Sequence, residues 1–482
     1  MLHLQHNYAN IDNRKNQVLG EELVMKRLIS LAILISLTAM QTVPALAIED
    51  NAQKENKKSV KITSNNNKYD YINLEWWQNF NDDYLNSYIV KAIENNKDLK
   101  IATLTIEEYY QNIVSQRSSQ LPTIHTGFLP GLSDIGEGTT DAYSVPIFAS
   151  WEIDIYGKNS NKTNAVRKLW EASILDERAA HISITSAVGS TYINIVKLDA
   201  MIDLQEDIVK LRKEIFEMME VANAEGLSST SDLVKANQAY IAGVTDLTEM
   251  KKNRSKLLHQ LAVLTGDSPN NIEEFARTDY KTLAFSGIIP NVVPSEIIMQ
   301  RPDYLKAEKM LEKAGIDVKV ARKECLPSIN LGGLVLFNAQ NIGSLFTTSN
   351  ALWGLGGGLL HPIFAGGRIK ANLKSKKIAY EKSLKNYEKV NLTSMQEVND
   401  TLVTINMDKE KLTKQKEIQA LEKKDFELSK LKYNEGIIAK LDLNQREENL
   451  LTVNQMVYSS YFDCFVDYIS YYKAVGAKTT IL

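Results

Sequence analysis

The sequence predicts a mainly α-helical protein with a small β part, built from two copies of one unit. Gly157-Lys158 recurs as Gly367-Arg368, and Glu225-Gly226 recurs as Glu435-Gly436, each time 210 positions later. The segments between these landmarks contain no proline, as expected for long helices. Because a duplicated unit usually buries its apolar face against its copy, we expect the two halves to form one body.

The composition is that of an ordinary folded chain and argues against several classes of protein. Of the 482 residues, 44% are apolar and 24% are charged, and the net charge is −3. A chain without a basic surplus is not expected to bind nucleic acid. Two cysteines, Cys325 and Cys464, are too few for a disulfide scaffold. The sequence contains no catalytic motif, metal-ligand spacing or phosphate-binding loop, so we expect no enzyme, no metal site and no cofactor.

One apolar segment near the N-terminus has the features of a secretory signal peptide. Residues 28–40 follow Lys26-Arg27 and end near an Ala-Leu-Ala sequence, as in cleaved signals. The run is too short for a membrane-spanning helix. We therefore interpret 25–47 as a signal peptide that starts at Met25, and 1–24 as an extension that is not translated or is dispensable. Neither cysteine lies at the cleavage site, so a lipid anchor is not expected.

The mature chain divides into a lead-in, two repeats and the segments that join them. Residues 48–73 are rich in Lys and Asn and are expected to be flexible. Repeat 1 covers 74–266 and repeat 2 covers 294–476. Residues 267–293 form a linker between them, and 477–482 form a tail. Each repeat is expected to contain a first helix, a strand hairpin, a long helix and a shorter helix.

Each repeat is dominated by one long helix, 158–224 in the first copy and 368–434 in the second. At ~1.5 Å per residue each would run about 100 Å, and its apolar residues recur as in a coiled coil. The seam comprises Met395, Val398, Leu402, Ile405 and Leu412, with Thr185, Val188, Tyr192, Ile195 and Ile202 in the first copy. Shorter helices are expected at 82–118, 231–264, 294–323 and 441–475, with a break near Arg301-Pro302-Asp303. Their lengths allow them to lie end to end beside the long helices.

Four extended segments, two per repeat, are expected to form strand hairpins at one end of the long helices. They cover 123–132, 142–156, 328–338 and 351–364. Four strands cannot close a barrel, and an open sheet edge cannot face lipid. A membrane barrel would therefore need eight strands from two chains or twelve strands from three chains. The sequence does not decide between these two numbers. The alternative is a small soluble β subdomain that caps a coiled coil. The signal peptide favours the membrane.

Four motifs in order resemble TolC-type outer-membrane efflux proteins, and most closely the OprM/NodT-like branch that serves RND pumps. They extend over roughly residues 74–478. The motifs are Trp76-Trp77-Gln78-Asn79-Phe80, Ser150-Trp151-Glu152-Ile153-Asp154-Ile155-Tyr156-Gly157-Lys158, Gln300-Arg301-Pro302-Asp303, and the segment from Leu352-Trp353-Gly354-Leu355 to Gly367-Arg368.

The resemblance implies a homotrimer in the outer membrane, with a long periplasmic extension. Twelve strands would form one barrel in contact with outer-membrane lipids, and the helices would form a periplasmic α-barrel. The helix tips would meet a periplasmic adaptor protein, and an inner-membrane pump of the RND or ABC type would supply the energy. The tip residues are Glu225, Gly226, Leu227, Glu435, Gly436 and Ile437. The strand–helix junctions comprise Trp151, Asp154, Gly157, Pro362, Gly367 and Arg368.

The resemblance also implies a constriction just behind the second tip. Asp442 matches the first of two aspartates that this family often carries there, whereas Gln445 stands where the second is expected. A single ring of carboxylates is therefore expected. A plain structural interpretation also exists, because an acidic residue in a first helical turn interacts favourably with the helix dipole. For Asp232, the counterpart in the first copy, that structural interpretation is preferred.

The function expected from these observations is a passive, gated exit duct of a tripartite efflux or export system. Two alternatives lack a pore: a secreted coiled-coil rod and a periplasmic adaptor. Adaptors carry one helical hairpin between β domains, whereas this chain has two hairpins and little β structure. The cargo cannot be read from the sequence.

Overall fold

The structure, a computed structural model, describes residues 75–134, 139–270 and 275–476. The chain divides into two units, 1–68 and 69–482, and every described residue belongs to the second. The predicted N-terminal extension, signal peptide, lead-in and C-terminal tail lie outside the described residues.

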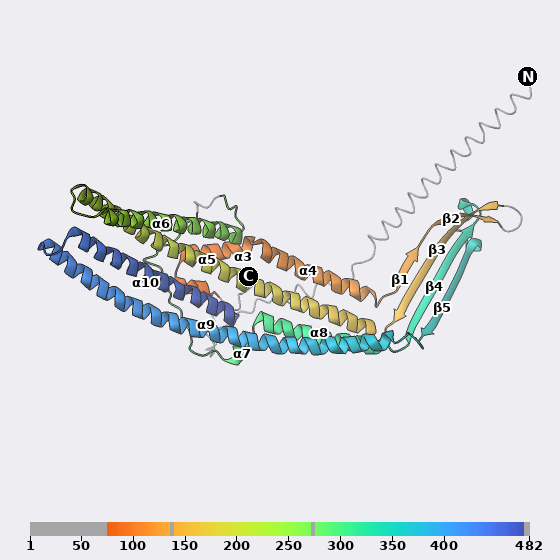
Figure 1. Ribbon diagram of the computed structural model, residues 1–482. Helices are drawn as coiled ribbons and strands as arrows, with labels where there is room; N and C mark the ends of the chain where they lie inside the picture. Colours follow the sequence, from red (N-terminus) through yellow and green to blue (C-terminus); the bar gives the residue numbers. More distant parts are fainter. Residues whose placement is uncertain (1–74, 135–138, 271–274, 477–482) are drawn as a thin grey trace, which may run out of the picture. The chain divides into compact units, whose positions relative to one another are not determined.

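Helices make up most of the described chain, and the two halves follow the same order (Figure 1). The first half contains the 3-10 helix η1 (Trp76–Phe80), α3 (Asp83–Asn95), α4 (Lys97–Ser118), three strands, α5 (Lys158–Ala224) and α6 (Thr230–Thr265). The second contains α7 (Ser295–Ile298), α8 (Pro302–Lys323), β4 (Ser328–Ala339), 3-10 turns η3 (Ile342–Ser344) and η4 (Thr348–Asn350), β5 (Ala351–Leu360), α9 (Arg368–Asn434) and α10 (Lys440–Val475). No helix of the described ranges is long and apolar enough to cross a membrane.

The long helices α5 and α9 have 67 residues each, and α6 and α10 have 36 each. Both α4 and α6 pack against α5, and both α8 and α10 pack against α9, so each long helix has two shorter ones end to end beside it (Figure 1). Helix α5 also contacts α8 and α10, which joins the two repeats. The predicted seam is buried at Val398, Leu402 and Ile405, and along all of its first-copy positions.

The prediction of one continuous helix over 82–118 was wrong, because the chain breaks at Asn96. The backbone of Asn96 is extended, with ψ at 133°, and its side-chain oxygen accepts hydrogen bonds from the N–H groups of Asp98 and Leu99. This side chain caps a new helix, α4, in the way that asparagine favours. In the second repeat the expected break is present, with Pro302 in the first turn of α8.

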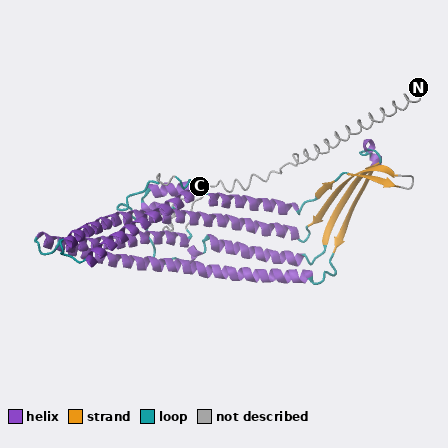
Figure 2. Cartoon of the chain, turned by 45° about the horizontal axis from the view of Figure 1, so that its top comes forward, coloured by secondary structure: helices purple, strands orange, loops and turns teal. Residues whose placement is uncertain are grey.

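The strands form one antiparallel sheet at the junction ends of the long helices (Figure 2). The order is β1 (Thr123–Thr126) and β2 (Leu129–Asp134), then β3 (Thr139–Ile153), β4 and β5. Both β1 and β2 pair with β3 in one continuous register, so they form a single interrupted strand. The interruption has a physical cause: Gly127 donates to the Pro146 carbonyl, but Pro146 has no N–H to return the bond.

Two strands end earlier than predicted. The expected strands end at Ile153 and Leu360, rather than at 156 and 364. In the second case Pro362 lies two residues beyond the end of β5 and cannot donate a ladder hydrogen bond.

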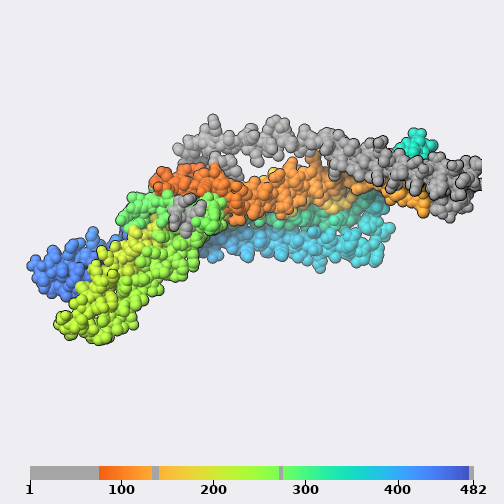
Figure 3. Space-filling view, turned by 90° about the horizontal axis from the view of Figure 1, so that it is seen from above, coloured from red at the N-terminus to blue at the C-terminus, as the bar shows by residue number. Residues whose placement is uncertain are grey.

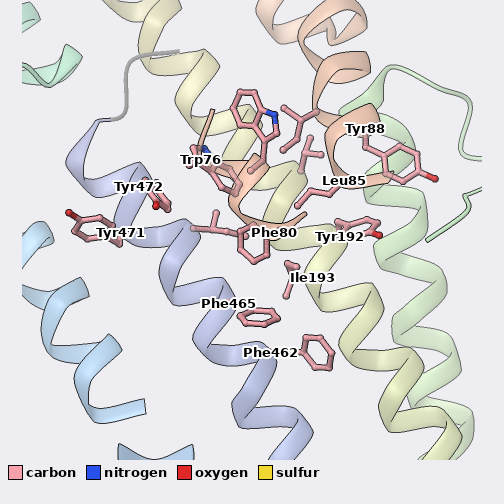
Figure 4. Packing of buried hydrophobic residues seen from close by; sticks show 14 of the residues in the cluster. Trp76, Phe80, Leu85, Tyr88, Tyr192, Ile193, Phe462, Phe465, Tyr471 and Tyr472 are labelled. Atoms are coloured by element: carbon pink, nitrogen blue, oxygen red, sulfur yellow. The ribbon is translucent and has the colours of Figure 1, made fainter. Parts of the chain in front are cut away.

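The main core lies where η1 meets α3, α5 and α10 (Figure 4). Trp76 is 2% exposed and stacks on Tyr472 with ring centroids 5.9 Å apart. The hydroxyl of Tyr192 on α5 donates to Asp82 at 2.7 Å and accepts from the Thr278 N–H at 3.1 Å. The opening Trp-Trp segment is therefore fixed to the middle of the long helices, where it ties together both repeats.

Candidate functional site

The two helix tips have the same backbone geometry. After α5, Gly226 has φ +71° and the Leu227 N–H donates to the Ala222 carbonyl; after α9, Gly436 has φ +70° and the Ile437 N–H donates to the Lys432 carbonyl. A Cβ at either glycine would meet no atom within 4 Å, so the left-handed backbone alone calls for glycine. The tips lie at the same end of the described structure (Figure 3).

Both tips carry an exposed apolar side chain next to the glycine. Leu227 is 81% exposed and Ile437 is 70% exposed. Glu225 and Glu435 are also exposed. Each tip therefore has one apolar and one acidic side chain available to a partner.

The segments that follow the two tips, at the starts of α6 and α10, form different hydrogen bonds. In the first copy, the Ser229 hydroxyl accepts from the Asp232 N–H at 3.1 Å and donates to the Asp232 carboxylate at 2.7 Å. This hydrogen bond lowers the pKa of Asp232. In the second copy Ala439 stands in place of Ser229, and the N-cap has no side-chain hydrogen bond to offer. The α5–α6 tip is thus better fixed than the α9–α10 tip.

The two constriction candidates are exposed on α10. The Asp442 carboxylate accepts from the Ala439 N–H at 3.3 Å, so it performs the structural role expected of a first-turn acid. Gln445 donates to the Asn449 side chain at 3.5 Å. Neither residue is buried in the single chain.

The first strand–helix junction is capped by a side chain. The two carboxylate oxygens of Asp154 accept from the N–H groups of Asn159 and Ser160 at 3.0 and 2.7 Å, and so hold the start of α5. Gly157 has φ +66°, and its carbonyl accepts from Lys323 at the end of α8. The Trp151 indole donates to the Gln120 carbonyl at 3.0 Å.

The second junction has no such side-chain cap. Phe364 occupies the position equivalent to Asp154, and it is 90% exposed. Gly367 has φ +83°, and Arg368 begins α9 with its N–H on the Ala365 carbonyl. Pro362 is exposed just after β5.

Arg301 links three helices in a way that its sequence motif does not reveal. It is 7% exposed, and its guanidinium binds both carboxylate oxygens of Asp303, at 3.0 and 2.7 Å. It also donates to Glu397 of α9 at 2.6 Å and to the Ala474 carbonyl near the end of α10. Arg301 therefore connects α8, α9 and α10 at the point where the start of α8 meets the end of α10.

A carboxyl pair between α9 and α10 predicts a pH dependence of stability. Burial and the nearby carboxylates of Asp408 and Asp463 raise the pKa of Asp467 from 3.8 to about 7. Between those values the folded chain keeps a proton that the unfolded chain has released, so stability falls as pH rises. We expect the free energy of unfolding to drop by roughly 1–3 kcal/mol from pH 4 to pH 7, and to level off above.

Urea unfolding measured across this pH range checks the expectation. The variant Asp467→Asn should flatten the profile, because it removes the titrating group. A wild-type profile that rises between pH 4 and 7, or a variant with an unchanged slope, would show that this pair does not control the pH dependence.

Comparison with known proteins identifies the family. A model of the outer membrane efflux protein family matches residues 88–267 and 293–458. The chain belongs to the outer membrane efflux protein family. It is 26% identical over 411 residues to the toluene efflux pump outer membrane protein TtgC of Pseudomonas putida, covering 83% of this chain and 84% of the relative. It is 27% identical over 409 residues to the cation efflux system protein CusC of Escherichia coli, covering 84% and 88%.

Solved structures of outer-membrane channels have the same fold. The Campylobacter jejuni CmeC channel aligns with a TM-score of 0.77 at 24% identity, covering 85% of this chain and 89% of CmeC. The Neisseria gonorrhoeae MtrE channel aligns with a TM-score of 0.74 at 24% identity, covering 83% and 90%. Members of the outer membrane efflux protein family are channel proteins and not enzymes. The predicted mainly α-helical fold and efflux-channel function are confirmed, and the rod or adaptor without a pore is not favoured.

Proposed function

We propose that three copies of this chain form one tunnel, the exit duct of a tripartite efflux system, with the sheets in the outer membrane and the helices in the periplasm. The observation that carries the proposal is that both the sheet and the helix layer have two unpaired edges. A single copy leaves these edges open, whereas a ring of identical copies pairs each edge with its opposite.

The sheet edges support a shared barrel. In one chain, the interrupted strand β1–β2 and the strand β5 each have a partner on one side only. Along β5, Trp353 is 80% exposed and Leu355 is 82% exposed. Unpaired backbone groups and open edges are not tolerated in lipid. Twelve strands from three chains would pair every edge and present these apolar side chains to outer-membrane lipids, with Trp151 and Trp353 near the interfaces.

The helix edges support the same arrangement. Helices α4 and α6 lie at one edge of the layer and α9 at the other. Exposed apolar side chains occur on both edges: Ile101 and Leu104 on α4, Ile241 on α6, and Leu392, Val403 and Leu421 on α9. Two different surfaces that bind one another head to tail close into a ring when the rotation between neighbouring copies closes.

The tips then lie at the periplasmic end. Glu225, Gly226 and Leu227, with Glu435, Gly436 and Ile437, would form the contact surface for a periplasmic adaptor. An inner-membrane pump of the RND or ABC type would drive transport. Behind the second tip, Asp442 would form a ring of three carboxylates, with Gln445 one turn further along.

Membrane fractionation tests this proposal. We expect the mature protein in the outer-membrane fraction, as an oligomer of three chains that dissociates on heating in detergent. A monomer released with the soluble periplasmic proteins would contradict the shared barrel.

A further inference from the structure

One buried amide behind the second tip has no hydrogen-bond partner. Asn444, in the second turn of α10, is 0% exposed. Among the described residues, neither its side-chain oxygen nor its nitrogen has a partner. A buried amide that has given up water without a replacement bond destabilises the packing that buries it.

The position of Asn444 is set by contacts further along the same helix. One turn later, Glu448 forms an ion pair with Arg212 of α5 at 2.7 Å. Further on, Gln455 donates to Gln205 of α5 at 3.0 Å. Residues four apart share a helix face, so Asn444 lies on the face of α10 that packs against α5.

The two repeats differ at this position. The counterpart of Asn444, 210 positions earlier, is Val234 on α6, which is 49% exposed. The repeats thus place an apolar side chain at the exposed site and an amide at the buried site. Because Asn444 is already fully buried within one chain, a neighbouring chain in the proposed trimer cannot supply the missing hydrogen bonds.

We infer that Asn444 is a positioning residue that lowers the free-energy cost of separating the α10 tip from α5. The closed channel can then open again more easily. When the first turns of α10 move away, the amide regains hydrogen bonds to water, which favours the open arrangement. The Arg212–Glu448 ion pair, one turn away, stabilises the arrangement in which α10 packs against α5. This inference rests on the proposed gated duct and assigns to it a residue that sets the opening equilibrium.

The test uses the full-length mature protein and the variant Asn444→Leu, whose side chain has nearly the same shape without polar atoms. We expect opening of the α10 tip to become on the order of tenfold less favourable. Backbone hydrogen exchange in 440–450 should then slow by about tenfold, and the open probability in planar bilayers should fall by a similar factor. Asn444→Val provides a second variant in case leucine is too large.

Val234→Leu is the matched control, because it places the same side chain at the exposed counterpart; exchange and conductance should stay at wild-type values. Faster or unchanged exchange in both Asn444 variants would overturn the inference, since it would mean that the amide has a partner such as a bound water. If the wild-type protein forms no channel, the proposed function fails, whereas the exchange measurement still decides the role of Asn444.

Discussion

Replacing Arg301 with methionine is expected to lower the free energy of unfolding by about 2–4 kcal/mol. The guanidinium is buried and makes charge-assisted bonds to Asp303 and Glu397, and a further bond to the Ala474 carbonyl. The acids themselves are 45% and 57% exposed, so they regain water when the arginine is lost. The loss in free energy of unfolding is therefore smaller than it would be if two buried carboxylates were left without a partner. Urea unfolding of the purified protein measures it.

A surface ion pair on the same helix provides the control for Arg301. Lys306 binds Asp176 at 2.7 Å, but these side chains are 41% and 53% exposed. Exposed pairs contribute at most about 1 kcal/mol, so Lys306→Met should have little effect. Equal losses for the two variants would show that Arg301 does not hold α8, α9 and α10 together.

Replacing Trp76 with alanine is expected to cost about 3–5 kcal/mol, the range for removing a large aromatic side chain from a core. Trp76 is 2% exposed, stacks on Tyr472 and meets Phe80 edge to face at 6.1 Å. Its removal would leave a cavity where the opening segment binds the long helices. Thermal unfolding should show a large decrease in melting temperature.

The pair formed by Trp76 and Gly189 tests this packing more sharply. A Cβ at Gly189, within α5, would lie 2.5 Å from the Trp76 ring, so Gly189→Ala should destabilise the wild type. In the Trp76→Ala background the same change should destabilise much less, because only the Ile469 side chain, 3.2 Å from the added Cβ, remains close and because alanine favours helix over glycine. Gly315→Ala on α8 is the control, since its Cβ would be at ordinary contact distance, 3.6 Å from Tyr380. Additive effects of the first two changes would argue against direct contact.

The repeat and the long helices could be predicted from the sequence, because their signals are local and periodic. The spacing of 210 residues between copies is reproduced by α5 and α9, whose first and last residues differ by that number. The glycines at the tips could also be predicted, since left-handed backbone at a helix end favours glycine. The tip, junction and constriction roles remain predictions.

The features that escaped prediction depend on contacts between distant residues. The strand interruption at Gly127 arises from Pro146 on the paired strand. The burial of Arg301 depends on α9 and α10, about 100 and 170 positions away. Asn444 is notable only because the packing of α10 buries it completely. The break at Asn96 was the exception: the Asn-Lys-Asp sequence there is a local capping signal.

Single-channel recording in planar lipid bilayers tests the central claim most directly, namely that copies of this chain enclose a conducting tunnel. The purified wild-type oligomer should produce discrete, stepwise increases in ion conductance without any nucleotide or other energy source. Insertion of the oligomer into the bilayer with no conductance steps, at any applied voltage, would contradict the account.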